Sequence, residues 1–496
     1  MRTAGGAQKL VEHFGSAADE ASIALLVADA QRRKAEILGS EQQTLDLPGL
    51  PTPAEASAGQ SHPGAARMAG TVARVLYQTL GGVYDKIGFG TVVDSQVFKK
   101  LVIARLVEPS SKRRAIEVLN SLGIDGVPSY STVKRHLQRA IDEDWRDAVC
   151  RAAYQFATTD GPVSLCLYDA TTLYFEADEE DTYRRRGFSK ERRVDPQIVV
   201  GLLVDRTGFP LEVHSHPGNT AEATTIIPVL ESFKTRHGIE DIVVVADAGM
   251  LSQANCEALQ DAGYQFIIAS KVGKMPKGLK AHLEAVGDPV ENGWTTSISE
   301  KLRTNSTKQW RTVYHFSWKR YYRDQQNLNK QIFRAQDIAA GKRAIAKARF
   351  VTIQGKDIGI NEADIERAKK LLGIKGYVTS AAETMLSNQE VVAHYHAIFE
   401  VEASFRLAKH DLEARPIFHQ HKDMIEAHLT LVFTALAIAR HMQSATGLSL
   451  RRILDQLRPL QDGIIHTSGN RFLVPAQLTD EAQQILQTLD LDELTH

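Results

Sequence analysis

Two aspartates stand where a site for divalent metal ions is expected. Asp169 follows the apolar run 165–168, and Asp247 follows a second apolar run at 243–246. Carboxylate oxygens are the ligands that Mg²⁺ and Mn²⁺ prefer, and the binding sites of α/β sheets lie at strand ends. An aspartate at a strand-to-helix turn is also a common helix N-cap, and this is the alternative for each residue taken alone.

Helical spacing selects a third carboxylate. The segment from Tyr395 to Lys409 has helical periodicity and contains two glutamates, Glu400 and Glu402. At about 3.6 residues per turn, Glu402 lies on the same face as Tyr395 and Lys409. Glu400 is turned to the opposite side. Glu402 is therefore the predicted third ligand, and the alternative is a solvated helix with an ordinary Glu402–Arg406 ion pair.

A sheet has to bring the two aspartates together. Runs of apolar and β-branched residues predict buried strands at 163–168, 197–204, 242–246 and 265–269. Strands this uniformly apolar are typical of a sheet that is covered on both faces. A helical pattern at 251–262 separates the last two runs. The fold class that we expect is therefore α/β, with a mixed sheet.

Composition limits the classes of protein that remain. The 496 residues are 43% hydrophobic and 24% charged, which is typical of a globular chain with about three domains. The formal net charge of -1 excludes a uniformly basic coat, so any nucleic-acid surface must be local. Three scattered cysteines predict neither a disulfide framework nor a zinc site. The longest apolar stretch, 429–439, is about half of a membrane span, so we expect a cytoplasmic protein with no membrane partner.

The chain divides into segments around a core that is split in two. We expect an N-terminal appendage at 1–45, a linker at 46–68, a helical domain at 69–157, a core at 160–270 and 376–445, a β-rich insertion with many basic and aromatic residues at 271–375, and a C-terminal helical region at 446–496.

The helical domain contains the outline of a helix-turn-helix. A turn at 127–129 precedes a Ser or Thr cap and a short basic helix that carries Lys134 and Arg135. In such a motif these two residues would contact DNA. Any capped surface helix has the same outline, and that is the alternative.

The motifs around the three carboxylates resemble the catalytic signature of DDE transposases of bacterial insertion sequences. Asp169 stands in Y-D-A-T-T-L-Y-F-E, Asp247 in V-V-A-D-A-G-M, and Glu402 in Y-x6-E-x2-F-R-x2-K. The long segment between the second and third motifs is similar to the branch with a β-rich insertion before the glutamate. The resemblance spans about 165–440.

This resemblance implies a ribonuclease-H-like core in which Asp169, Asp247 and Glu402 hold two Mg²⁺ or Mn²⁺ ions. Two such ions can activate the attacking oxygen and stabilise the leaving oxygen of a phosphodiester. Water would cut DNA at the terminal inverted repeats of an insertion sequence, and the freed 3′-hydroxyl would attack target DNA. Because two ends must be paired, the working complex would be a dimer or larger.

The resemblance also implies contacts with DNA phosphates beside the glutamate. The tyrosine and lysine of the family pattern correspond to Tyr395 and Lys409. The arginine usually found three residues after the tyrosine is replaced by Ile398. Its contact would then come from His396 or Arg406, or be absent.

Two further basic segments are expected to bind DNA. The run after the first catalytic strand consists of Arg184, Arg185, Arg186, Lys190, Arg192 and Arg193. Residues 301–349 carry 13 Lys or Arg and only two Asp, and their Trp310 and Trp318 are candidates for stacking on an unpaired base. The alternatives are a solvated loop for the basic run and a packed inner sheet face for the rings.

Two other functions stay open on the sequence alone. One is a catalytically silent DNA-binding protein derived from such an element, against which the intact Asp169, Asp247 and Glu402 argue. The other is a nuclease of the same fold that cuts DNA without joining it.

Overall fold

The structure, a computed structural model, describes most of the chain from Arg67 onward. The described residues are 67–176, 179–188, 194–239, 242–270, 272, 275–287, 290–302, 308–344, 348–354, 357–415, 417, 419, 421–467, 470–491 and 493. The expected N-terminal appendage at 1–45 and almost all of the expected linker at 46–68 lie outside the described residues. The elements that build the site belong to one compact unit, 68–465 with 471–496.

Three helices in the first described part of the chain begin at a serine N-cap. Ser95, Ser111 and Ser129 each accept a hydrogen bond from the backbone amide three residues further on, as an N-cap serine does. The helices that follow β1 (Arg67–Val72) are α3 (Arg74–Lys86), α4 (Phe89–Val92), α5 (Gln96–Val107), α6 (Lys112–Ser121), α7 (Tyr130–Asp142) and α8 (Trp145–Ala157). This part of the chain is thus mainly helical, as the spacing of its apolar residues predicts.

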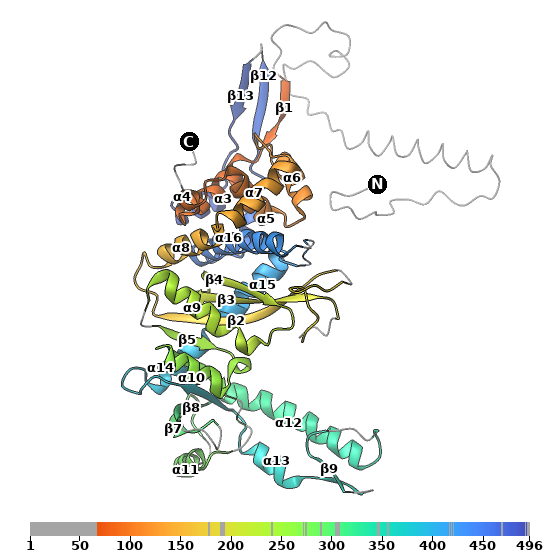
Figure 1. Cartoon of the computed structure of the whole chain (residues 1–496), viewed down its shortest axis with the longest axis vertical. Coiled ribbons are helices and arrows are strands. Elements are labelled where there is room, and N and C mark those ends of the chain that lie inside the picture. Colours follow the sequence, from red (N-terminus) through yellow and green to blue (C-terminus); the bar gives the residue numbers. More distant parts are fainter. Residues whose placement is uncertain are drawn as a thin grey trace, which may run out of the picture. The chain divides into compact units, whose positions relative to one another are not determined.

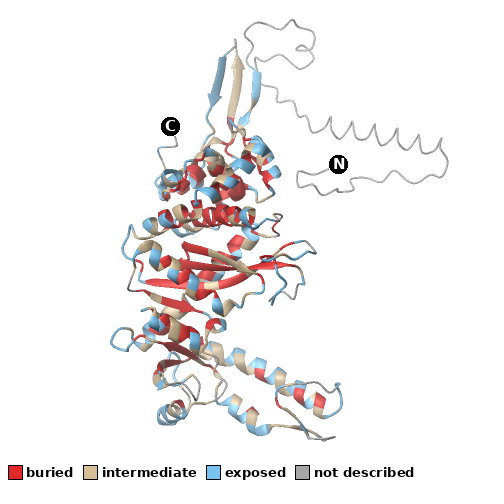
Figure 2. Ribbon diagram, in the orientation of Figure 1, coloured by how far each residue is buried: buried red, intermediate tan, exposed pale blue. Residues whose placement is uncertain are grey.

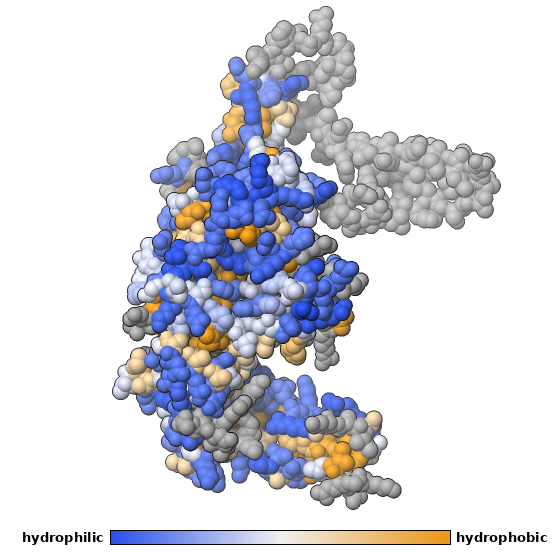
Figure 3. All heavy atoms as spheres, in the orientation of Figure 1, coloured by the Kyte–Doolittle hydropathy of each residue, from blue (hydrophilic) through white to orange (hydrophobic). Residues whose placement is uncertain are grey.

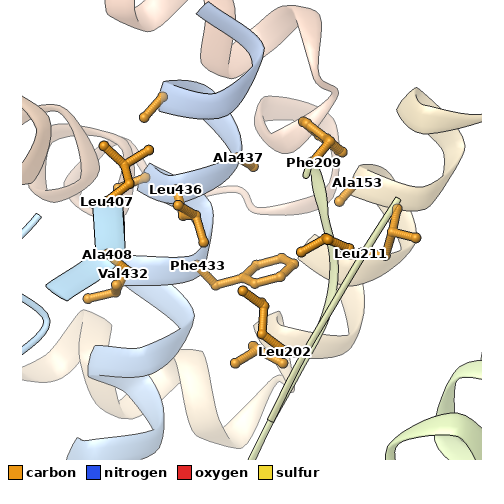
Figure 4. Packing of buried hydrophobic residues seen from close by; sticks show 14 of the residues in the cluster. Ala153, Leu202, Phe209, Leu211, Leu407, Ala408, Val432, Phe433, Leu436 and Ala437 are labelled. Carbon is orange, nitrogen blue, oxygen red and sulfur yellow. The ribbon is translucent and has the colours of Figure 1, made fainter. Parts of the chain in front are cut away.

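One long helix, α16 (Lys422–Thr446), lies between these helices and the sheet (Figures 1 and 2). It packs on α5, α7 and α8 and also on β4 (Pro210–Pro217). Every residue from 427 to 439 is buried, which explains why the helix is apolar on all sides. Figure 4 shows Phe433 of this helix pointing toward Leu202 and Leu211 of the sheet. None of the described helices, α16 included, is long and apolar enough to cross a membrane.

The core is an eight-stranded mixed sheet with the strand order β4-β3-β2-β5-β6-β11-β8-β7. The strands that hold the first two motifs are β2 (Leu165–Tyr174), β3 (Gln197–Asp205), β5 (Val243–Ala246) and β6 (Gln265–Ser270). β2, β3 and β4 form an antiparallel meander, and β5 and β6 continue the sheet parallel to β2. This is the arrangement of a ribonuclease-H-like core, so the predicted fold class is confirmed.

Helices cover both faces of the sheet (Figure 1). On one face lie α9 (Ile226–His237) and α10 (Gln253–Asp261), and there the Tyr168 hydroxyl donates a hydrogen bond to Thr225 Oγ1 at 2.6 Å. On the other face α15 (Phe399–Arg406) packs on β2 and β3, beside α16. Side chains of β2 therefore point alternately toward α9 and toward α15.

The insertion extends this sheet and adds helices to it. Its strands β7 (Thr295–Glu300), β8 (Trp310–Phe316) and β11 (Ile374–Thr379) continue antiparallel from the edge of β6. The structure differs from the expected β-rich segment because Trp318–Ala339 forms the long helix α12. The remaining elements are α11 (Lys277–Val286), β9 (Val351–Gln354), β10 (Asp357–Ile360) and α13 (Glu362–Lys369).

The C-terminal region also differs from the expected helical piece. It contains α17 (Leu450–Leu457) and α18 (Asp480–Thr488), but between them lie the strands β12 (Asp462–Thr467) and β13 (Asn470–Val474). These strands form a three-stranded sheet with β1, in the order β1-β12-β13. β-branched residues at 464, 465 and 467 favour a strand here, and the partner β1 lies far away in the sequence.

Candidate active site

Asp169 and Asp247 occupy matching positions on two adjacent parallel strands. β2 and β5 pair with Tyr168 opposite Ala246, and each aspartate is the next residue along its strand. Because side chains alternate along a strand, both aspartates lie on the face opposite Tyr168, away from α9. Two carboxylates separated by 78 positions in the chain are thus neighbours in the sheet.

The position of Asp169 corrects one expectation. Asp169 does not end its strand, because β2 continues to Tyr174 and pairs with β3 as far as Gln197. The strand that ends at this level is β5, whose last residue is Ala246. Asp247 begins a short 3₁₀ turn, but its side chain makes no capping hydrogen bond there. The capping alternative therefore holds for neither aspartate.

Tyr395 connects the glutamate helix to the second aspartate. It lies on α14 (Asn388–His396), and its hydroxyl donates a hydrogen bond to Asp247 Oδ1 at 3.0 Å. Burial raises the pKa of Tyr395, and the negative charges of Asp247 and Glu402 raise it further. The hydroxyl therefore keeps its proton and stays a donor.

The two glutamates on α15 face different surroundings. Glu400 forms an ion pair with Arg440 of α16, which ties it to the core. Glu402 is exposed, and among the described residues it forms no ion pair with Arg406. The ordinary helix pair that was the alternative for Glu402 is therefore not made.

The helix that carries this motif is not one straight helix. α14 ends at His396 and α15 begins at Phe399. Between them the amide of Ile398 donates to the carbonyl of Tyr395 at 3.0 Å, a tighter turn of 3₁₀ type. After Arg406 the chain widens into a π-helical turn at 407–411. The expectation of one regular helical face from Tyr395 to Lys409 is thus corrected.

Lys409 reaches the strand of the first aspartate despite this break. Its ammonium group donates a hydrogen bond to Thr171 Oγ1 on β2. Thr171 is two residues after Asp169 and therefore lies on the same face of the strand. The family arginine position, Ile398, is buried in the main core and presents no cation to a ligand.

The donor set of the three motifs suits a hard divalent ion. Asp169, Asp247 and Glu402 offer only carboxylate oxygens, the ligands of Mg²⁺ and Mn²⁺. Within the described residues, no group of three His, Cys, Asp or Glu side chains lies close enough to hold a metal ion. Asp169 and Asp247 are brought together by the strand register, and Tyr395 lies between Asp247 and the glutamate helix.

Sequence reasoning missed a carboxylate near the turn that follows Asp247. Glu222 lies in a short 3₁₀ turn that packs on the turn after Asp247. One of its oxygens would be 3.9 Å from a Cβ on Gly249. Together with Asp169, Glu222 raises the pKa of Tyr168, whose burial raises it most.

The expected basic run has mixed surroundings. Arg184 is buried, forms an ion pair with Asp181 at 2.7 Å, and lies over the ring of Phe175. Arg185 and Arg186 are exposed beside Glu180. Lys190, Arg192 and Arg193 lie outside the described residues. Arg184 therefore stabilises the loop and does not present a surface cation.

The two tryptophans also differ in exposure. Trp310 is 3% exposed, packs against Phe266, and donates from its indole nitrogen to Gln260 Oε1 at 3.2 Å. Such a ring has no free face for a base, so its expected stacking role is corrected to a core role. Trp318 is partly exposed at the start of α12 and packs edge-on against Phe316 and Tyr321.

The helix expected to recognise DNA is present as α7. Ser129 caps it, and Lys134 and Arg135 are exposed on its surface. Lys134 Nζ lies 5.2 Å from the centre of the Tyr130 ring. On the face seen in Figure 3, hydrophilic residues dominate this part of the molecule.

Comparisons with known proteins agree with the motifs. A family model described as a transposase DDE domain matches residues 161–438. No curated protein sequence matches the chain.

Three solved structures show a distant likeness to the chain. A piggyBac transposase synaptic complex with hairpin DNA has 10% identity and a TM-score of 0.37, covering 77% of this chain and 70% of that one. A Mos1 transposase paired-end complex with the left transposon end has 13% identity and a TM-score of 0.16, covering 48% and 66%. A pre-cleavage Mos1 transpososome has 13% identity and a TM-score of 0.16, covering 36% and 56%.

Proposed function

The chain belongs to the family of DNA transposases with a DDE domain, and from this premise we propose that Asp169, Asp247 and Glu402 are its catalytic residues. The observation that carries the proposal is the strand register, which makes Asp169 and Asp247 neighbours at the end of β5. The bond from Tyr395, which stands on the motif that also carries Glu402, to Asp247 supports a common site for the three motifs.

The proposed chemistry is cleavage and joining of DNA strands. Two Mg²⁺ or Mn²⁺ ions bound by the three carboxylates would stabilise the attacking and the leaving oxygen of a phosphodiester. Through these ions the carboxylates would hold the scissile phosphate at the end of β5. Water is the first nucleophile, and the 3′-hydroxyl that it frees is the second. No side chain has to form a covalent intermediate.

Two neighbours of the carboxylates have positioning roles in this proposal. Tyr395 donates to Asp247 and so fixes the orientation of that carboxylate, leaving its other oxygen for an ion. Lys409 donates to Thr171, two residues after Asp169 on β2. An ammonium group at this place attracts the phosphate of the bound strand. Both residues stand on the motif that also carries Glu402.

The proposed substrates are the terminal inverted repeats of an insertion sequence and a target DNA. Exposed cations for them are Lys134 and Arg135 on α7, Arg185 and Arg186 after β2, and Arg406 on α15. Because two transposon ends must be cut and joined together, we propose a dimer or larger assembly on DNA.

A cleavage assay on the DNA that flanks the gene tests this function. The wild-type chain is expected to nick the inverted repeats only with a divalent ion, and Asp169→Asn is expected to remove nicking. Products in which a labelled 3′ end is joined to target DNA distinguish a transposase from a nuclease of the same fold. Binding of the repeats without any nicking by the wild-type chain would instead favour a silent DNA-binding protein.

A further inference from the structure

Basic side chains gather beneath α7, away from the carboxylates. Arg105 of α5 is 6% exposed, Lys112 of α6 is 8% exposed and His428 of α16 is 5% exposed. Lys112 Nζ donates to His428 Nδ1 at 3.1 Å, and His428 Nε2 lies 3.3 Å from the carbonyl oxygen of Ala414. The ring of His419 lies 5.8 Å from that of His428, centre to centre. The cluster thus joins two helices of the helical domain to the start of α16.

The acid that acts on this cluster is Glu413, whose charge raises the pKa of Arg105 against the larger lowering by burial, without forming an ion pair. Among the described residues, neither Arg105 nor Lys112 has a carboxylate within the 4.0 Å of an ion pair. Burial lowers the pKa of Lys112, and the nearby Arg105 lowers it further. Burial also lowers the pKa of His419 to about 4, with added repulsion from Lys112 and Arg105. Buried cations without a counter-ion are costly, so an anion at this place would be stabilised.

The cluster opens into a cavity of about 440 Å³. Lys112 and His419 form its inner wall, and Tyr130 and Lys134 of α7 form its rim. The rim is basic, because Arg113 lies 4.9 Å and Lys134 lies 5.2 Å from the centre of the Tyr130 ring. The cavity is therefore reached from the helix that is expected to bind DNA.

The start of α16 faces the same cavity. His421 is the N-cap residue of α16, and no side chain caps the helix there. Backbone amides at a helix N-terminus attract anions. Asp423, which is exposed, is the carboxylate among the cavity-lining residues, and Met424 lies next to it. The buried cations and the uncapped amides thus favour the same kind of ligand.

We propose that this cavity binds a phosphate group, and that in the working complex it is a backbone phosphate of the bound DNA. The proposal rests on the proposed function for the identity of the DNA, but the phosphate chemistry follows from the cavity alone. Lys112 is the central contact, because it is buried on the cavity wall and a bound phosphate would stabilise its protonated form. A phosphate held there would connect α7 to α16 and hence to the sheet.

The first experiment uses inorganic phosphate without DNA. At constant ionic strength, phosphate in place of chloride is expected to raise the melting temperature of the full-length chain. Lys112→Met, and as a second variant Lys112→Gln, should lose this shift. Lys234→Met is the matched control, since Lys234 bonds to the carbonyl of Ala262 far from the cavity, and it should keep the shift. The phosphate shift of each Lys112 variant is measured from its own melting temperature without phosphate, because each variant also loses the bond to His428.

The second experiment measures the salt dependence of binding to a short DNA duplex. If a backbone phosphate occupies the cavity, Lys112→Met should reduce the slope of log K against log salt by about 0.9, the value for one phosphate contact. Lys234→Met should leave the slope unchanged. A phosphate shift in melting temperature without a change in slope would identify a free phosphate as the ligand.

The proposal would be overturned if phosphate did not raise the melting temperature of the wild type and Lys112→Met did not reduce the salt slope of DNA binding. Failure of the proposed function is a separate result, because it would be seen as cleavage that survives in Asp247→Asn. The phosphate experiment contains neither DNA nor a divalent ion, so it does not depend on that outcome.

Discussion

The hydroxyl of Tyr395 donates a hydrogen bond to the carboxylate of Asp247 across 148 positions of the chain. This bond connects the second acidic motif to the motif that carries Glu402. The sequence pattern predicts that Tyr395 contacts a DNA phosphate, but in the structure its partner is a carboxylate. Tyr395 is therefore proposed to position Asp247 for its metal ion.

Tyr395→Phe keeps the ring and removes this bond. Loss of a group that orients a metal ligand typically costs 10- to 100-fold in metal affinity or activity, and we expect a loss of about that size in DNA cleavage. The midpoint of a Mg²⁺ titration should move to higher concentration, while the affinity for DNA changes little. A variant with a lower rate but an unmoved Mg²⁺ midpoint would show that the hydroxyl has no part in the metal site.

Glu402→Gln and Glu400→Gln form a matched pair on one helix. Glu402→Gln should abolish cleavage and retain end binding, because it removes a proposed metal ligand. Glu400→Gln should cleave almost normally but lose its ion pair with Arg440, at a cost of about 1 kcal/mol or less in unfolding free energy. Cleavage rates and urea unfolding of both variants check this. Equal losses of cleavage would contradict the assignment of Glu402.

The exposed bases of α12 are predicted to contact DNA. Lys330 and Arg334 are exposed one turn apart on this helix. Replacing both by Gln should lower the salt slope of DNA binding by up to about 1.8, since each phosphate contact contributes about 0.9. The same double change at Lys277 and Lys280 of α11 is the control and should leave the slope unaltered. An unchanged slope in the α12 variant would show that Lys330 and Arg334 make no contact with DNA phosphates.

Stability is predicted to decrease in mild acid because of two half-buried histidines. Burial lowers the pKa of His237 and of His441 to about 4. In the unfolded chain a histidine titrates near about 6.5, so the unfolded state binds protons first as the pH falls. The stabilisation is complete above about pH 6.5 and is lost as the pH falls toward about 4. Urea midpoints between these values should decrease, and His441→Gln should make the decrease smaller. If the urea midpoint of His441→Gln decreased as much as that of the wild type, His441 would not contribute to the loss of stability.

Much of the fold could be predicted because its signals are local. The apolar runs before Asp169 and Asp247 became β2 and β5, and serine caps preceded helices, as at Ser129. The extent of β2 beyond Asp169 could not be predicted, since it depends on the pairing of Tyr174 with Gln197. Strand β12 likewise depends on β1, almost four hundred positions away.

The sequence predicted which residues form the candidate site, but it predicted only some of their contacts. Glu402 was selected over Glu400 by helical spacing, and the ion pair of Glu400 with Arg440 agrees with that choice. The turn at Ile398 could not be predicted, because the sequence there contains no Pro or Gly. The structure shows that the isoleucine is buried at this turn. The role of Trp310 could not be predicted, because its hydrogen bond to Gln260 joins residues that are far apart in the sequence.

The most direct test of the central claim exchanges the metal ion together with one of its ligands. A thiolate ligand prefers softer ions than a carboxylate does, so Asp247→Cys should lose cleavage with Mg²⁺ and regain much of it with Mn²⁺. The wild-type chain should cleave with both ions. The same exchange at Asp169 and Glu402 should give the same pattern if the three side chains share the metal site. Equal cleavage by Asp247→Cys with Mg²⁺ and with Mn²⁺ would contradict the account.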